Sequence, residues 1–137
     1  MITVSFRPSQ LRNPQSKKQP DYLLVNWHVS GQSHLWRPPT DLLELEDHFL
    51  IRIEIAGMHE KDFEISLDQN LVSVSGVRQD IPDRRAYHQM EINFGEFVSM
   101  IEIPGQIDAG QVTAEYQSGF LLIYLPKAPP KQIHLHE

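Results

Sequence analysis

Histidines and scattered carboxylates are the residues of this sequence with the most evident capacity for chemistry. The 137 residues include seven histidines and no cysteine, so thiolate ligands and thiolate nucleophiles are excluded. His134 and His136 stand two residues apart, a spacing that places them on one side of a strand. No third ligand is evident near them in the sequence. We therefore predict surface histidines and no metal site; the seven are His28, His34, His48, His59, His88, His134 and His136.

Catalytic arrangements of other kinds find no support. The serines on expected strands lack the G-x-S-x-G context of a nucleophile elbow. Neighbouring carboxylates, Glu44 with Glu46 and Asp80 with Asp83, are typical of solvated surfaces. The sequence holds no Gly-x-x-x-x-Gly-Lys loop and no dinucleotide-binding fingerprint. We predict that the protein is not an enzyme and uses neither ATP nor another cofactor. The serines are Ser66, Ser73, Ser75 and Ser99.

Charge is distributed unevenly along the chain. Residues 1–35 carry four basic residues and one acidic residue, whereas residues 36–137 carry eight basic and 17 acidic residues, a net charge of −9. An acidic body is unsuited to nucleic acid. The basic segment is either a solvated tail or a contact for an acidic partner, including the body of another copy. No signal-peptide pattern or membrane-length apolar run is evident, so we expect no membrane partner and a cytoplasmic location.

Hydrophobic periodicity indicates how the rest of the chain is organised. From Thr40 onward apolar and polar residues alternate in several short segments, which predicts strands with one buried face. Turn residues at Asp68-Gln-Asn70 and Ser118-Gly119 separate them. Short strands at this spacing predict an antiparallel β-sandwich or barrel, and no segment has a helical period. The expected strands are 49–55, 63–67, 72–75, 97–103, 112–115 and 121–125, with residues 86–92 as a further candidate inside the insertion 79–96.

The two ends differ from this pattern. Residues 1–35 contain Pro8, Pro14 and Pro20, which prevent a long helix, and we predict that they form a flexible arm. Trp36-Arg-Pro-Pro39 marks the boundary of a domain over residues 36–127. Residues 128–137 form an extension that begins with a proline-rich spacer. The arm contains one apolar patch, formed by Tyr22, Leu23, Leu24, Val25 and Trp27.

An ordered set of motifs resembles the small heat-shock (alpha-crystallin) family. The stretch Ala114-Glu-Tyr-Gln-Ser-Gly-Phe-Leu-Leu-Ile-Tyr-Leu-Pro-Lys127 is similar to the family's A-x-x-x-x-G-x-L…P-K signature. Further segments match in the same order along the chain, and the resemblance covers roughly residues 36–127 plus the tail. These segments are Pro39-Thr-Asp41, Ile55-Ala-Gly57, Leu71-Val-Ser-Val-Ser-Gly76, Tyr87 to Phe97, and Ile103-Pro104.

The resemblance implies an immunoglobulin-like β-sandwich that forms a homodimer. A strand at residues 84–92 would swap onto the partner's sheet, with Arg84, Arg85, Tyr87, His88, Met90 and Ile92 in the swap loop. The tail motif Ile133-His-Leu135 would enter a groove in another subunit and build a larger homo-oligomer. The resemblance places this groove between strands 63–67 and 112–116, and we expect its lining to be Ile65, Leu67, Val112 and Ala114.

The function implied is that of an ATP-independent holdase, which binds unfolding client proteins and prevents their aggregation. The apolar patch of the arm is expected either to capture clients or to dock on its own dimer. The alternatives are a co-chaperone-like module that binds one specific partner, and a structural assembly subunit. One position departs from the family pattern: Ser99 stands where the family usually has arginine, which puts a charge pair across the dimer in doubt.

Overall fold

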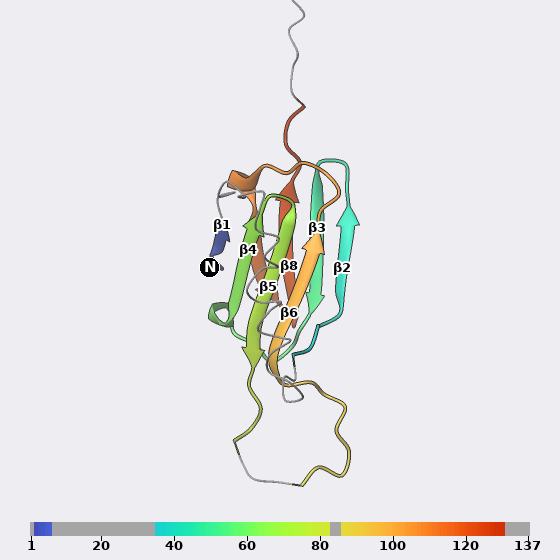
Figure 1. Ribbon diagram of the computed structural model, residues 1–137, viewed down its shortest axis with the longest axis vertical. Helices are drawn as coiled ribbons and strands as arrows, with labels where there is room; N and C mark the ends of the chain where they lie inside the picture. The colour runs from blue at the N-terminus through green and yellow to red at the C-terminus, as the bar shows by residue number, and fades with distance from the viewer. Residues whose placement is uncertain (1, 7–34, 83–85, 131–137) are drawn as a thin grey trace, which may run out of the picture.

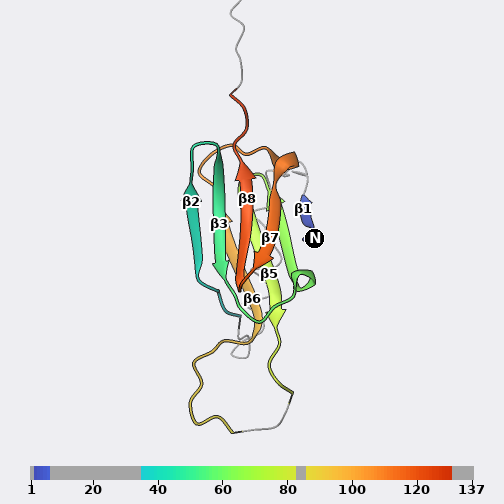
Figure 2. The same cartoon turned by 180° about the vertical axis from the view of Figure 1, so that it is seen from behind.

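The structure is a computed structural model that describes residues 2–6, 35–82 and 86–130. Two four-stranded sheets pack face to face (Figures 1 and 2). The first sheet has the order β1-β4-β5-β6 and the second the order β2-β3-β8-β7. The described residues contain two short 3-10 turns, η1 (Glu60–Asp62) and η2 (Ala109–Gln111), and no α-helix. The prediction of an all-β, immunoglobulin-like antiparallel β-sandwich is confirmed.

The strands follow the predicted alternation closely. The first sheet contains β1 (Val4–Phe6), β4 (Phe63–Asp68), β5 (Leu71–Arg78) and β6 (Gly95–Glu102). The second contains β2 (Thr40–Glu44), β3 (His48–Glu54), β7 (Thr113–Gln117) and β8 (Phe120–Pro126). All neighbouring strands are antiparallel except β1 and β4, which are parallel.

The core lies between the two sheets, because each strand directs its apolar parity inward. Ile51, Ile53 and Ile55, in β3 and just after it, are fully buried, whereas Arg52 and Glu54 between them are exposed. The same alternation on β4, β5, β6 and β8 completes one continuous cluster. Burying each such aliphatic side chain contributes about 1.5–3 kcal/mol. The residues of this cluster on the other strands include Phe63, Ile65, Leu67, Val72, Val74, Phe97, Ile101, Leu121, Ile123 and Leu125.

Both predicted hairpin turns are present. Gln69 adopts a positive φ of 55° between β4 and β5, and Ser118 and Gly119 adopt φ of 52° and 82° between β7 and β8. Two consecutive positive φ values characterise the turn that suits the right-handed twist of a two-residue hairpin. These turns fix the register that sends the apolar parity of each strand into the core.

Two elements differ from the sequence-based expectation. Residues 1–35 were expected to form a flexible arm, but this is wrong for residues 2–6, since Val4–Phe6 pairs with β4 and Ile2 is 7% exposed. Strand β2 was not predicted separately, because the adjacent Leu42 and Leu43 interrupt the alternation. Pairing with β3 from Thr40 to Glu44 defines it instead.

Candidate interaction surfaces

The four residues expected to line the groove lie on β4 and at the start of β7 or just before it. Ile65 and Leu67 point inward from β4 and are 2% and 3% exposed. Val112 and Ala114, just before and within β7, are half-buried and pack against the same core. All four side chains therefore face the core between the two sheets. That they bind the tail stays a prediction, because Ile133 and Leu135 lie outside the described residues.

An aromatic contact joins the two strands that flank this groove. The rings of Phe63 in β4 and Tyr116 in β7 have centroids 5.1 Å apart. The Tyr116 hydroxyl donates a hydrogen bond of 2.7 Å to the backbone oxygen of Ile55. Because the ring of Tyr116 contacts Phe63 and its hydroxyl is bonded to Ile55, these contacts fix the separation of β4 and β7 near Phe63. Sequence reasoning did not single out Tyr116, although its place two residues after Ala114 predicted an inward position.

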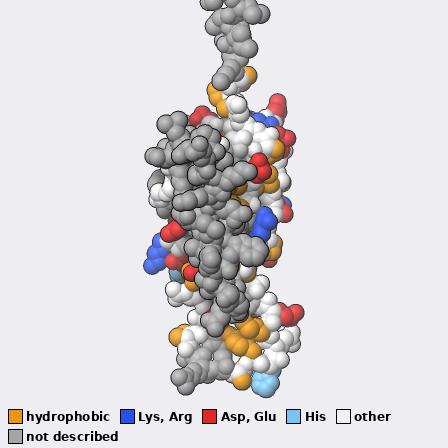
Figure 3. Space-filling model, viewed as in Figure 1, with side chains coloured by type: hydrophobic (Ala, Val, Ile, Leu, Met, Phe, Trp, Pro, Cys, Tyr) orange, Lys and Arg blue, Asp and Glu red, His pale blue; other side chains and the backbone are white. Residues whose placement is uncertain are grey.

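The long loop between β5 and β6 carries the most exposed apolar side chains of the described chain. Ile81 is 66% exposed, Ile92 63%, Met90 61% and Tyr87 48%. The loop extends beyond one end of the sandwich (Figure 1), and hydrophobic side chains gather there on the surface in Figure 3. Exposed apolar clusters of this kind mark sites of interaction.

The expected swap strand is not present as a strand in the single chain. Residues 86–93 are irregular, and His88 is exposed with the other loop side chains. A strand exists only where a neighbour supplies backbone hydrogen bonds, so a segment that pairs with a partner's sheet is not expected to be ordered as a strand alone. Arg84 and Arg85 lie outside the described residues, as does the apolar patch of residues 22–27.

Arg78, the last residue of β5, holds the base of this loop. Its Nε donates a hydrogen bond of 2.9 Å to the backbone oxygen of Asn93, which also accepts a hydrogen bond from Nη2. Its Nη1 donates to the backbone oxygen of Ala56 at 3.3 Å. The guanidinium also stacks 4.5 Å from the centroid of Trp36 and 5.3 Å from that of Phe94. Sequence reasoning missed Arg78, since nothing in its local pattern distinguishes it from a surface arginine.

Trp36 packs against the edge of the first sheet. Its ring lies 5.7 Å from that of Phe97, and its backbone exchanges hydrogen bonds with Glu96 and Val98 on the outer edge of β6. The segment that precedes β2 is thereby attached to the first sheet. The loop base, β6 and the start of the domain form one connected unit through Trp36 and Arg78.

Ser99 is fully buried, at the position where the family usually has arginine. Its hydroxyl lies 2.8 Å from that of Thr40 at the start of β2. Because the Thr40 hydroxyl donates its single hydrogen to the Pro38 oxygen at 2.9 Å, Ser99 is the donor to Thr40. The short hydroxyl chain joins β6 to β2 and leaves no buried polar atom unpaired there.

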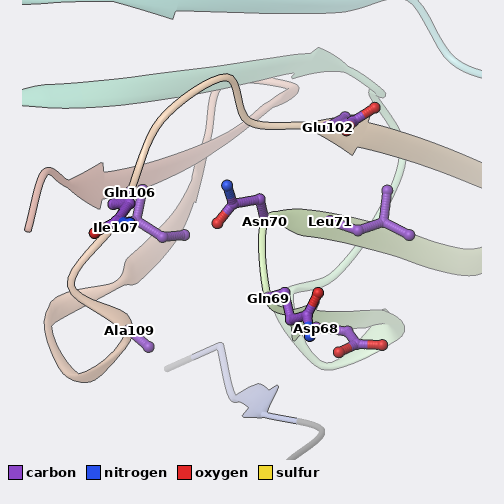
Figure 4. Close-up of a pocket in the computed structure, with 8 residues that line it drawn as sticks. All are labelled: Asp68, Gln69, Asn70, Leu71, Glu102, Gln106, Ile107 and Ala109. Carbon is purple, nitrogen blue, oxygen red and sulfur yellow. The ribbon is translucent and has the colours of Figure 1, made fainter. Parts of the chain in front are cut away.

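One polar cleft lies on the surface formed by the described residues. The cleft in Figure 4 lies at the end of the sandwich where β4 and β5 turn, and its carboxylates are Asp68 and Glu102. Across residues 2–6, 35–82 and 86–130, no three histidines or carboxylates are placed to hold a metal ion. In the same ranges, no helix has the length and apolar character needed to cross a membrane.

Two ionisable groups, the exposed Asp47 and the half-buried Tyr124, have shifted pKa values, both through hydrogen bonds to side chains. A 2.6 Å contact with Nδ1 of His48 lowers the pKa of Asp47 below its usual range. The hydrogen bond that Tyr124 donates to Glu115, 3.0 Å long, raises the pKa of the Tyr124 hydroxyl. Both pairs lie on the surface of the second sheet and outside the groove and the loop.

The chain resembles curated proteins named as small heat-shock or spore proteins. It is 28% identical to small heat shock protein C4 of Rickettsia felis over 92 residues, covering 66% of this chain and 56% of that protein. It is 30% identical to spore protein SP21 of Stigmatella aurantiaca over 156 aligned residues, covering 98% and 92% of the two chains. The chain thus spans little more than half the length of C4 and nearly all of SP21.

Solved structures with the same fold carry matching names. The hspA protein of Xanthomonas axonopodis superposes with a TM-score of 0.65 at 26% identity, covering 70% of this chain and 98% of that one. Heat shock protein 16.0 of Schizosaccharomyces pombe gives a TM-score of 0.61 at 27% identity, covering 73% and 98%. The model of the Hsp20/alpha crystallin family matches residues 41–136. Because this match extends from β2 through the end of β8 and beyond, the chain belongs to the Hsp20/alpha crystallin family.

Proposed function

We propose that the protein is an ATP-independent chaperone, a holdase that binds unfolding proteins and prevents their aggregation. The observation that carries the proposal is the exposed apolar loop between β5 and β6, displayed from a well-packed sandwich of the Hsp20/alpha crystallin family. A holdase needs apolar surface for clients, and a stable scaffold that keeps this surface from disrupting its own core. Membership of a family of small heat-shock proteins supports a chaperone role.

The dimer would be formed through the loop and the edge of β2. Strand β2 is the last in its sheet and pairs on one side with β3, and its Leu42 is 38% exposed. An extended segment of a second copy that pairs with β2 would satisfy the edge and cover apolar side chains of both. Met90 and Ile92, two residues apart, would then lie on one face of the added strand.

Larger oligomers would form when the tail of one copy binds the groove of another. Ile133 and Leu135 are spaced to enter the groove together, next to Ile65 and Leu67. Burial of the two would contribute about 1.5–3 kcal/mol each, whereas ordering each backbone residue would cost about 1–2 kcal/mol. One tail is therefore weak, and many tails in one assembly act together through high effective concentration. Subunits would exchange readily.

The test is the aggregation of a heat-destabilised client protein, followed by light scattering without ATP. Intact protein at a one-to-one ratio of chains should suppress scattering. The variant Met90→Ser/Ile92→Ser should suppress less, and Leu45→Ser, which changes an exposed leucine at the opposite end of the sandwich, should behave as the parent. Failure of the intact protein with several unrelated clients would refute the holdase proposal. It would favour a partner-specific module or a structural subunit.

The contribution of the apolar arm patch is tested separately. Replacing Tyr22, Leu24 and Trp27 with serine keeps strand β1 in place, which a deletion of residues 1–35 would not. If the patch captures clients, the triple variant should lose protection while keeping the particle size of the parent. If the patch docks on its own dimer, particle size should change instead.

A further inference from the structure

Strand β1 occupies the edge of β4 that borders the groove. Val4, Ser5 and Phe6 pair in parallel with Ile65, Ser66 and Leu67. Ile2 is 7% exposed and belongs to the core cluster, and Val4 packs against that cluster. Figure 1 shows β1 beside β4, and in Figure 2 β1 lies at the same edge of the sandwich as β7. The groove side of the sandwich is therefore filled by residues from the start of the same chain.

This position has room for one strand. The other edge of β4 is paired with β5 from Phe63 to Asp68. A strand edge offers a single row of backbone donors and acceptors, so a segment that pairs with β4 on the groove side must displace β1. Whatever binds there binds in competition with residues 2–6.

The chain contains two segments with the same pattern for this position. Ile2-Thr-Val4 and Ile133-His-Leu135 each place two branched aliphatic residues on either side of one polar residue. In an extended chain such residues point to one side, as Ile2 and Val4 do here. Thr3 and Ser5 lie on the opposite side, on the outer face of the first sheet. The two segments therefore share the residue pattern that this position accepts from β1.

We propose that strand β1 is a resident competitor of the tail, so that residues 2–6 must leave the groove before the tail of a second copy can bind. The inference rests on the tail–groove contact proposed above and adds the element that regulates it. The β1 pairing is only three residues long, and Phe6 at its end is 48% exposed, so β1 is a weakly held strand. The apparent affinity of the tail equals its intrinsic affinity multiplied by the fraction of chains in which the groove is open, so a resident β1 lowers it.

The test measures binding of a fluorescent peptide of residues 128–137 to the full-length chain. The chain carries Ile133→Ser and Leu135→Ser, so that its own tail does not compete. Adding Ile2→Ser and Val4→Ser should tighten peptide binding about tenfold if β1 fills the groove in roughly nine-tenths of the chains. The matched control is Thr3→Ser/Ser5→Thr, which changes the outward residues of the same strand and should leave the affinity unchanged. Hydrogen exchange should be faster at the β4 amides that face β1 in the Ile2/Val4 variant only.

Each outcome decides a different point. Equal peptide affinity with and without Ile2 and Val4 would overturn the competition and leave the tail–groove contact standing. Unchanged hydrogen exchange in β4 would overturn the assignment of Ile2 and Val4 as the residues that anchor β1. Absence of peptide binding to every variant would overturn the tail–groove contact itself, and the competition with it. Client protection by the loop would be unaffected by that last result.

Discussion

Replacing Arg78 with glutamine is expected to destabilise the domain by loosening the base of the long loop. The guanidinium donates to the backbone oxygens of Asn93 and Ala56 and lies against the rings of Trp36 and Phe94. Hydrogen bonds from charged donors contribute about 1.5–3 kcal/mol, and a cation over an aromatic ring at an exposed site about 0.5–1 kcal/mol. Because Arg78 is half-buried and water replaces part of what is lost, we expect a net loss of about 2 kcal/mol.

Urea unfolding at one fixed protein concentration measures this loss, since self-association adds to apparent stability. The midpoint should fall while the slope with denaturant concentration stays constant. Arg52→Gln is the matched control, because Arg52 makes an exposed 2.7 Å ion pair with Asp41 and such pairs contribute about 0–1 kcal/mol. A loss for Arg78→Gln no larger than that for Arg52→Gln would refute the role assigned to Arg78.

Three further substitutions test particular contacts. Gly76→Ala should lower the free energy of unfolding, measured with urea, by about 3 kcal/mol, because a Cβ there would lie 2.6 Å from the backbone oxygen of Asp62. A decrease below about 1 kcal/mol would contradict this packing. Ser99→Ala should cost about 1 kcal/mol, because it removes the donor to the threonine hydroxyl of β2, and an unchanged midpoint would contradict that bond. His48→Ala should raise the pKa of Asp47 toward its ordinary value in an NMR titration. The lowered pKa of Asp47 stabilises the folded state at pH values above the pKa that this carboxyl has in the unfolded chain. That stability is lost as the pH falls through the pKa of Asp47 in the folded state. An unchanged pKa of Asp47 in the His48→Ala variant would contradict the contact between the two side chains.

The sandwich was predictable because its buried strands carry their own signal. The alternation of Ile51 and Ile53 with Arg52 indicates both the strand and its buried face, and Ser118-Gly119 indicates the turn. Strand β1 has a comparable signal, since Ile2, Val4 and Phe6 alternate with polar residues. The prolines of the following segment favour a flexible arm, and the sequence alone groups residues 2–6 with that arm. The parallel pairing with β4, some sixty residues away, is a tertiary contact that no local pattern reveals.

The groove and the loop were predictable to different extents for a physical reason. The inward parity of Ile65 and Ala114 follows from strand alternation, so their position on the core side could be predicted from the sequence, whereas their contact with the tail stays a prediction. The role of Arg78 could not be predicted, because it depends on two backbone oxygens and two aromatic rings that are distant in the sequence and converge in the fold. Ser99 was noticed only as a departure from the family pattern. Its burial beside Thr40 gives that departure a structural role within one chain.

Substitutions in the loop between β5 and β6 can separate the folding of the single chain from the assembly of its copies. Met90 and Ile92 are 61% and 63% exposed, so replacing both with serine should change the free energy of unfolding of the single chain by less than about 0.5 kcal/mol. If the loop pairs with the partner's β2, the same variant should weaken the dimer at least tenfold in sedimentation at micromolar concentration. Leu45→Ser, at an exposed position of similar character away from the loop, should leave the dimer intact. A dimer of equal strength in both variants would show that the apolar loop serves clients and leaves the subunit contact to other residues.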